Sequence, residues 1–225
     1  MSAPLVLVPG LSGSVAHDFD FLAPMLARRR EVIAVDLEPG DPVAQLAAAA
    51  PDGATLLGYS LGATVAAGYA AAQPARVGSL ILVSGWLAPS AKLLAYAGLW
   101  STIHDDAVLA EVARQSMYSA AGWESSRPVP VDARSRGLVP CLSASVEADA
   151  ITAPTLVVGA AFDEVAGRRQ SRLLFGAIAN ARYAEIASGH ATVHERPAEL
   201  LALIDAFLLD PEAQPAGSTL AESRP

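Results

Sequence analysis

The sequence predicts an α/β fold: an open, mostly parallel, doubly wound sheet of about six strands with a helical insert. Short, continuous apolar runs alternate with segments of helical pattern, as expected for buried parallel strands joined by helical crossovers. The chain has 225 residues, of which 52% are hydrophobic and 17% are charged, and this is enough to enclose one such core. One segment, residues 87–150, contains no strand-like run and breaks the alternation.

The predicted strands are short and rich in Val, Leu and Ile, a composition that favours a sheet covered on both faces. In chain order they are Leu5–Val8, Val32–Val35, Thr55–Leu57, Leu80–Val83, Thr155–Val158 and Tyr183–Ile186. The last run contains Glu185, and a charged side chain is typical of an edge strand. We therefore expect this run to form one edge of the sheet.

The predicted helices fill the intervals between these runs. They are Phe19–Arg29, Pro42–Ala50, Leu61–Ala72, Val165–Ala179 and Pro197–Leu208. Pro42 follows Asp41, and Pro197 lies close after Glu195; proline suits the first turn of a helix, where its missing N–H costs no hydrogen bond. Because these crossovers gather the carboxyl ends of parallel strands at one edge, we expect functional residues in the loops that follow the strands.

The chain divides into a core, an insert and a tail. Residues 1–86 and 151–210 are predicted to form an α/β core, and residues 87–150 are predicted to form a helical cap over it. Residues 211–225 are rich in Pro, Glu, Ser and Ala, a composition typical of a disordered segment.

The insert gathers the largest aromatic side chains. Its helical patterns run near residues 91–100 and 106–118, and an irregular, proline-containing segment follows them. The three tryptophans, Trp86, Trp100 and Trp123, lie at the start of this insert or within it. This clustering is consistent both with an apolar lid over the carboxyl edge of the sheet and with a small separate core.

A motif that carries chemistry follows the third predicted strand. Residues 58–62, with the sequence GYSLG, separate Thr55–Leu57 from an alanine-rich helix, which is the strand–turn–helix context of the GxSxG motif. Such a turn strains the backbone at Ser60, and it needs small residues at Gly58 and Gly62 so that strand and helix can approach closely. It also places Ser60 at a helix N-terminus, where negative charge is stabilised. We predict Ser60 as a nucleophile; a glycine-rich turn with an incidental serine is the alternative.

With this motif, the chain resembles the α/β-hydrolase fold family over nearly its whole length. The family places an oxyanion loop after an early strand, and here Leu5–Val8 leads into Pro9 and Gly10, where the family usually has His-Gly. The oxyanion donors in the family are backbone N–H groups, which the resemblance assigns to Leu11 and Leu61. The family's usual N-terminal hairpin has no counterpart here, so we expect an N-terminally trimmed version of the fold.

The resemblance also implies a triad in the chain order serine, acid, histidine. His190 follows the last predicted strand in a loop similar to the family's catalytic-histidine loop, so it is the candidate general base for Ser60. Asp163 is the candidate acid, although it lies one position further from the preceding glycine than the family places it. Two alternatives stay open: Glu164 as the acid, and Asp163 as the cap of the following helix.

These residues predict acyl chemistry on a small-molecule substrate. The leading hypothesis is a serine hydrolase that cleaves an ester, thioester or lactone of a small to medium apolar compound through an acyl-enzyme on Ser60. We assign Gly10, Tyr59 and Trp86 to the substrate pocket. Two alternatives use the same fold differently: a lyase or natural-product tailoring enzyme with the same residues, and a binding protein without catalysis.

Composition and charge argue against other classes of protein. The formal net charge of -8 leaves no basic face for nucleic acid, and no apolar stretch is long enough for a membrane span. The lone Cys141 forms no intrachain disulfide, which fits a cytoplasmic location. His190 and His194 lack the glutamate of a zinc-binding helix, so we expect no metal and no cofactor. The oligomeric state is left open.

Overall fold

The strands form one open sheet in a computed structural model that describes residues 3–222. The sheet has seven strands in the order β2-β1-β3-β4-β5-β6-β7, and every neighbouring pair is parallel. The strands are β1 (Leu5–Val8), β2 (Val32–Ala34), β3 (Ala54–Tyr59), β4 (Val77–Val83), β5 (Thr155–Ala160), β6 (Ala181–Ile186) and β7 (Thr219–Glu222). The predicted α/β fold with an open parallel sheet is confirmed, with one strand more than expected.

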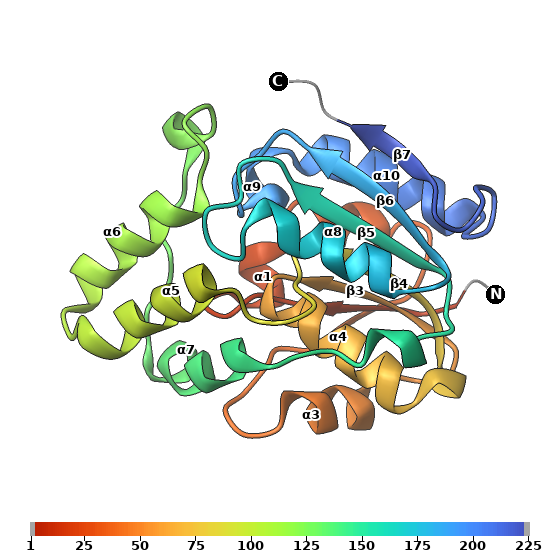
Figure 1. Ribbon diagram of the computed structural model, residues 1–225, viewed down its shortest axis with the longest axis horizontal. Helices are drawn as coiled ribbons and strands as arrows, with labels where there is room; N and C mark the ends of the chain where they lie inside the picture. Colours follow the sequence, from red (N-terminus) through yellow and green to blue (C-terminus); the bar gives the residue numbers. More distant parts are fainter. Residues whose placement is uncertain (1–2, 223–225) are drawn as a thin grey trace.

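Helices cover both faces of this sheet (Figure 1). The α-helices are α1 (Val15–Asp18), α2 (Leu22–Leu26), α3 (Pro42–Ala49), α4 (Leu61–Ala72), α5 (Ala91–Thr102), α6 (Asp106–Met117), α7 (Ala133–Leu138), α8 (Arg168–Ala177), α9 (Thr192–Glu195) and α10 (Pro197–Leu209). Short 3-10 turns are η1 (Pro74–Arg76), η2 (Trp123–Ser125), η3 (Val139–Ser143) and η4 (Ala148–Ala150). Helices α3, α4 and α8 pack on one face, and α1, α2 and α10 pack on the other.

The inner strands β1, β3, β4 and β5 each contribute to two cores, which explains why their sequences are largely apolar. In β1, Val6 and Val8 belong to the core under α3, α4 and α8, whereas Leu5 and Leu7 belong to the core under α1, α2 and α10. Successive side chains of a strand point to opposite faces, so a sheet covered on both sides needs an apolar residue at every position.

The strand that contains Glu185 lies inside the sheet, so the prediction of an edge strand is wrong. β6 is paired on both sides, with β5 and β7, and the Glu185 side chain is buried. Glu185 accepts hydrogen bonds from the guanidinium groups of Arg168 and Arg172 on α8 and from the Tyr183 hydroxyl. A buried carboxylate is tolerated when charged donors satisfy its oxygens, and here the two charged donors come from the helix that precedes the strand.

The tail is ordered where it meets the sheet, contrary to the prediction of disorder for residues 211–225. Thr219–Glu222 form β7 and pair in parallel with β6, and the last three residues of the chain lie outside the described range. The Arg182 side chain donates to the backbone carbonyl of Gln214 at 2.7 Å, which anchors the segment before β7. The free edge of β6 offers backbone hydrogen bonds to this polar segment. The composition of a segment does not show whether such a strand edge is available to it.

The segment between β4 and β5 is helical and lies beyond the carboxyl ends of the strands (Figure 1). Helices α5, α6 and α7 belong to it, and no strand occurs in residues 87–150. Trp86 and Trp100 are buried in the same continuous core as α3, α4 and α8, so these aromatic side chains extend the main core. Trp123 instead stacks on the Arg114 guanidinium, which lies 3.7 Å from the ring centre.

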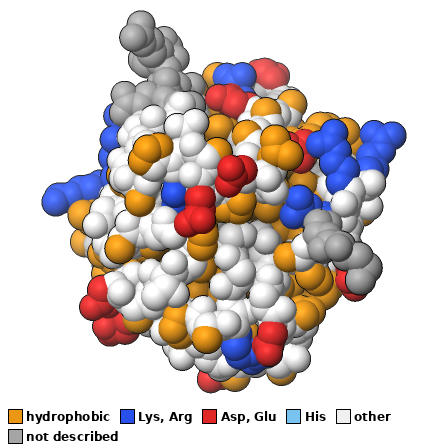
Figure 2. Space-filling model, turned by 90° about the vertical axis from the view of Figure 1, so that its right-hand side faces the viewer, with side chains coloured by type: hydrophobic (Ala, Val, Ile, Leu, Met, Phe, Trp, Pro, Cys, Tyr) orange, Lys and Arg blue, Asp and Glu red, His pale blue; other side chains and the backbone are white. Residues whose placement is uncertain are grey.

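On the face shown in Figure 2, Lys and Arg side chains are scattered among Asp and Glu side chains, without one large basic patch. Within residues 3–222, none of the helices has both the length and the apolar character needed to cross a lipid bilayer.

Candidate active site

Ser60 lies in a sharp turn between β3 and α4. Its backbone has φ 55° and ψ -118°, a conformation that L-residues rarely adopt, so the predicted strain at this serine is confirmed. A Cβ atom on Gly58 would lie 2.4 Å from the carbonyl oxygen of Gly62, and one on Gly62 would lie 2.2 Å from that of Val8. Both glycines are therefore required by the close packing of the turn against β1 and α4.

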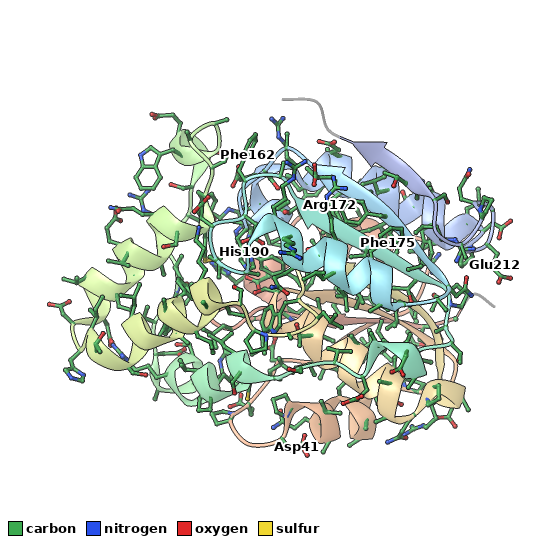
Figure 3. All side chains as sticks on the ribbon, viewed as in Figure 1. Asp41, Phe162, Arg172, Phe175, His190 and Glu212 are labelled. Carbon is green, nitrogen blue, oxygen red and sulfur yellow. The ribbon has the colours of Figure 1, made fainter. Side chains whose placement is uncertain are left out.

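His190 and Asp163 meet Ser60 at the carboxyl edge of the sheet. His190 belongs to the histidine loop (residues 187–191), which connects β6 to α9, and Figure 3 shows it between the sheet and the insert. Its Nε2 atom is 2.7 Å from Ser60 Oγ, and its Nδ1 atom is 2.9 Å from Asp163 Oδ2. All three side chains are buried, and they form one continuous chain of hydrogen bonds. The structure thus brings together the three residues that the sequence singled out.

Asp163 contacts His190, as the candidate acid should, but it does not cap the following helix, because α8 begins after its N-cap residue Gly167 and has no side-chain cap. The Oδ1 atom of Asp163 accepts hydrogen bonds from the N–H groups of Val165, Ala166 and Gly167, while Oδ2 faces His190. Burial acts to raise the pKa of Asp163, but the charge of His190 and these hydrogen bonds outweigh it and hold the pKa below its usual value. The group facing His190 is therefore an ionised carboxylate.

Glu164, the alternative acid, points away from the site. Its side chain is 66% exposed and forms an ion pair with Lys92 at the start of α5. A carboxylate paired in solvent with the insert cannot orient the buried imidazole of His190, so the geometry favours Asp163.

The hydroxyl groups of Ser84, Thr192 and Ser188 form hydrogen bonds that hold the histidine loop in place. Ser84, the residue after β4, donates from Oγ to the His190 carbonyl at 3.3 Å, and its Oγ also lies 3.3 Å from Thr192 Oγ1. Thr192 in turn bonds Ser188 at 2.8 Å. Ser84 has φ 53° and is fully buried. The backbone of His190 is thus held from β4, while its ring is held by Ser60 and Asp163.

A carboxylate joins the insert to the histidine loop. Glu195 Oε1 accepts from the N–H groups of Gly189 and Ser119, both at 2.9 Å, and Oε2 accepts from the Ser119 hydroxyl. The backbone repeats this link, because Ala191 N–H donates to the Met117 carbonyl at 2.9 Å. The end of α6 is therefore tied directly to the loop that supplies the histidine.

The first loop supplies backbone donors near Ser60. Gly10 N–H donates to Asp18 Oδ2 at 2.8 Å, which holds the loop and leaves the next amide, that of Leu11, without a hydrogen-bond partner among residues 3–222. Leu61 is the first residue of α4, so its N–H has no acceptor within the helix. Both predicted oxyanion donors are thus available to a ligand.

A small cavity lies beside Ser60 and His190. Its volume is about 20 Å³, room for about one water molecule. Gly10 and Tyr59 line it, as predicted, but Trp86 does not: it is buried in the core, and its Nε1 donates to the Ala144 carbonyl at 3.1 Å. The insert supplies an apolar wall that includes Leu93, Tyr96, Val129 and Leu142.

Two further histidines, His17 and His194, also line the cavity. His17 Nδ1 donates to Asp18 Oδ1 at 2.8 Å, and this hydrogen bond raises the pKa of His17. His194 Nε2 donates to the His17 carbonyl at 3.2 Å, so its Nδ1 accepts from the Tyr118 hydroxyl at 2.9 Å. Burial lowers the pKa of His194 and favours this neutral form.

His17, Asp18 and His194 also have the residue types of a metal site. One ligand atom from each lies within 4.8 Å of the others. In the structure, however, Asp18 already accepts from His17 and Gly10, and both ring nitrogens of His194 have hydrogen-bond partners. A metal ion would have to displace these contacts, so the arrangement fits a hydrogen-bond network better.

Three residues that shape the site were not predicted from the sequence: Ser84, Glu195 and Asp18. Ser84 directly follows β4 at the carboxyl edge of the sheet. Functional residues of parallel sheets gather in the loops after the strands, so this position alone could have marked Ser84 as a candidate. Glu195 was read only as part of a helix start, and Asp18 matches no motif. Gly10 lies 8 residues from Asp18, Ser119 lies 76 residues from Glu195, and His190 lies 106 residues from Ser84, and sequence spacing does not show such contacts.

Comparisons with known proteins agree with this architecture. No protein-family model matches the chain. A curated protein, the pyrrolizixenacetamide deacetylase of Xenorhabdus hominickii, is 27% identical to it, and the alignment covers 91% of this chain and 90% of that protein.

Several solved structures share the fold. A putative non-heme bromoperoxidase from Mycobacterium tuberculosis has a TM-score of 0.78 at 21% identity, covering 95% of this chain and 94% of its own. A thermophilic esterase from Thermogutta terrifontis has a TM-score of 0.78 at 19% identity, covering 95% and 92%. The enol-lactonase of Burkholderia xenovorans has a TM-score of 0.76 at 20% identity, covering 93% and 92%. The protein therefore has the α/β-hydrolase fold.

Proposed function

We propose that this protein is a serine hydrolase that cleaves a carboxylic ester, thioester, lactone or amide through an acyl-enzyme on Ser60. The observation that carries the proposal is the continuous hydrogen-bond chain from Ser60 through His190 to the ionised Asp163. Esterase and lactonase structures with the same fold support a hydrolytic reaction, and the deacetylase relative adds an acetamide to the candidate substrates. The chemistry requires only side chains, backbone amides and water.

In the first half of the reaction, Ser60 Oγ attacks the acyl carbon and its proton passes to His190 Nε2. The carbonyl oxygen becomes an oxyanion beside the N–H groups of Leu11 and Leu61. His190 then gives the proton to the leaving alcohol, thiol or amine as the bond to the acyl carbon breaks. The product is an ester of Ser60.

In the second half, a water molecule attacks the acyl-enzyme. His190 accepts a proton from this water and returns it to Ser60, and the carboxylic acid leaves. Asp163 stabilises the imidazolium that forms in both halves and holds the tautomer in which Nδ1 carries the proton.

The size of the cavity favours a short acyl group. The cavity beside Ser60 has room for about one water molecule, and the wall from the insert is apolar, which suits a small apolar acyl group. We therefore propose acetyl and propionyl compounds as the preferred acyl donors, with longer chains requiring movement of the insert.

Labelling with a fluorophosphonate tests the nucleophile without knowledge of the substrate. We expect one adduct per chain, mapped to Ser60 by mass spectrometry, absent from Ser60→Ala and formed slowly by His190→Ala. Ser84→Ala is the matched control, because this serine is also buried and strained but faces a carbonyl; it should label at Ser60 like the unmodified protein. A folded protein without an adduct would contradict the proposal.

A panel of acyl chain lengths and lactones then tests the substrate class. We expect kcat/KM to be highest for acetyl or propionyl esters. Labelling of Ser60 without turnover of any ester, lactone or amide would instead favour elimination or lyase chemistry on the same residues.

A further inference from the structure

The hydroxyl of Tyr59 is buried without a hydrogen-bond partner among residues 3–222. The side chain is 1% exposed, and it lines the cavity next to Ser60. A buried donor that makes no hydrogen bond destabilises the folded protein. For this reason most buried polar groups in proteins have a hydrogen-bond partner. This group therefore needs an explanation, and its position at the cavity suggests a ligand.

The ring of Tyr59 is held in a fixed place. A Cβ atom on Gly10 would lie 3.3 Å from Cδ1 and Cε1 of this ring, so the oxyanion loop packs closely on it. The ring centre is 5.7 Å from that of His190. Burial, and then the negative charge of Asp18, raise the pKa of the Tyr59 hydroxyl well above its usual value. The hydroxyl thus remains protonated and available as a donor.

The charges around the cavity decide which acceptor fits this donor. Among the described residues that line it, Asp18 is a carboxylate and none is Lys or Arg. The charge of protonated His17 is matched by Asp18, its hydrogen-bond partner. An anionic group of a substrate would meet no unmatched positive charge here, whereas a neutral oxygen needs none.

We propose that the Tyr59 hydroxyl donates a hydrogen bond to a neutral oxygen of the substrate, an ether, ester, ketone or amide oxygen close to the scissile acyl group. The inference rests on the proposed hydrolysis at Ser60 and narrows its substrate class to acyl compounds with a second oxygen acceptor. Such a donor selects substrates strongly, because a ligand without the acceptor leaves the buried hydroxyl unpaired.

Two pairs of nearly isosteric esters test this inference with the Tyr59→Phe variant. One pair places the oxygen in the acyl group: 4-nitrophenyl methoxyacetate against 4-nitrophenyl butanoate. The other places it in the alcohol: 2-methoxyethyl acetate against butyl acetate. We expect Tyr59→Phe to reduce kcat/KM about tenfold more for the oxygen-containing member of at least one pair. Equal losses within both pairs would overturn the inference.

Stability gives an independent readout. Removing an unpaired hydroxyl should leave Tm unchanged or raise it by about 2 °C, so Tyr59→Phe is expected to lose selectivity without losing stability. A clear fall in Tm would show that the hydroxyl already has a partner within the folded protein, and this would also overturn the inference.

Tyr69 provides a matched control. Its hydroxyl is likewise buried without a partner in the described part of the chain, but this residue of α4 does not line the cavity. Tyr69→Phe should therefore leave kcat/KM unchanged for all four esters. Failure of the inference and failure of the proposed function are distinguishable: the first leaves an active, labelled Ser60 with equal losses in each pair, and the second leaves no labelled Ser60.

Discussion

Ser60 and Ser84 occupy equivalent places in neighbouring strands and share an unusual backbone. Among the described residues, they are the two non-glycine residues with positive φ, 55° and 53°. Each directly follows its strand, and the last residues of these strands, Tyr59 and Val83, are paired in register. Both hydroxyls contact His190, but Ser60 faces the ring nitrogen and Ser84 faces the backbone carbonyl.

The difference between the two serines shows that backbone strain alone does not define a nucleophile. The strained backbone at the end of a strand sets the direction of the serine hydroxyl. The chemistry of that hydroxyl then depends on the atom with which it forms a hydrogen bond. A ring nitrogen can accept the proton of Ser60, whereas a carbonyl oxygen only receives a hydrogen bond from Ser84. Ser60 also borders the cavity, while Ser84 is fully buried.

The largest expected difference is in turnover. Ser60→Ala should reduce kcat for a short-chain ester by about 10⁶-fold, because the covalent route is lost. Ser84→Ala removes one weak hydrogen bond to the His190 backbone and should reduce kcat by less than about tenfold. Steady-state kinetics of both purified variants measure this, and similar losses in the two would show that the serines act as one unit.

The next effect concerns the other contact of the same histidine. Asp163→Asn keeps an oxygen for the N–H groups of Val165 and Ala166 but presents an amide to His190, which favours the wrong tautomer. We expect kcat to fall by about 10⁴-fold with little change in circular dichroism. Glu164→Gln is the control and should retain full activity; the opposite pattern would make Glu164 the acid.

The smallest effect concerns the strain itself. Ser84→Ala loses the hydroxyl and keeps the strained φ, whereas Ser84→Gly loses the same hydroxyl and relaxes the backbone. We expect the glycine variant to have a free energy of unfolding about 1 kcal/mol above that of the alanine variant, measured by urea denaturation. If alanine is the more stable variant, the positive φ at Ser84 carries no strain.

The sequence was most informative where short-range chemistry sets the structure. The GYSLG motif located Ser60 because the turn demands glycines at fixed spacing, and apolar runs located the strands that the structure confirms. His190 and Asp163 were found through resemblance to a family, and their side chains do meet Ser60. Their catalytic roles stay predictions until the labelling experiment is done.

The remaining features depend on contacts between separate segments. β7 forms because β6 offers an open edge, and Glu185 is buried because α8 supplies guanidinium groups. An aromatic residue at the start of an insert can face either the pocket or the core. The sequence placed Trp86 in the pocket, whereas in the structure it packs in the core. The link from Glu195 to Ser119 joins α9 to the segment after α6, which lies 76 residues away in the sequence.

The order of the strands also bears on how the chain is made. A ribosome releases the N-terminal part first; β3 pairs with the free side of β1, and from β4 to β7 each newly released strand pairs with the strand before it. No strand has to insert between two that are already paired. The elbow of Ser60 can thus form early, whereas Asp163 and His190 follow only after β5 and β6. A nascent chain halted before β7 would expose a buried strand as its edge, a site for aggregation that the short polar β7 covers.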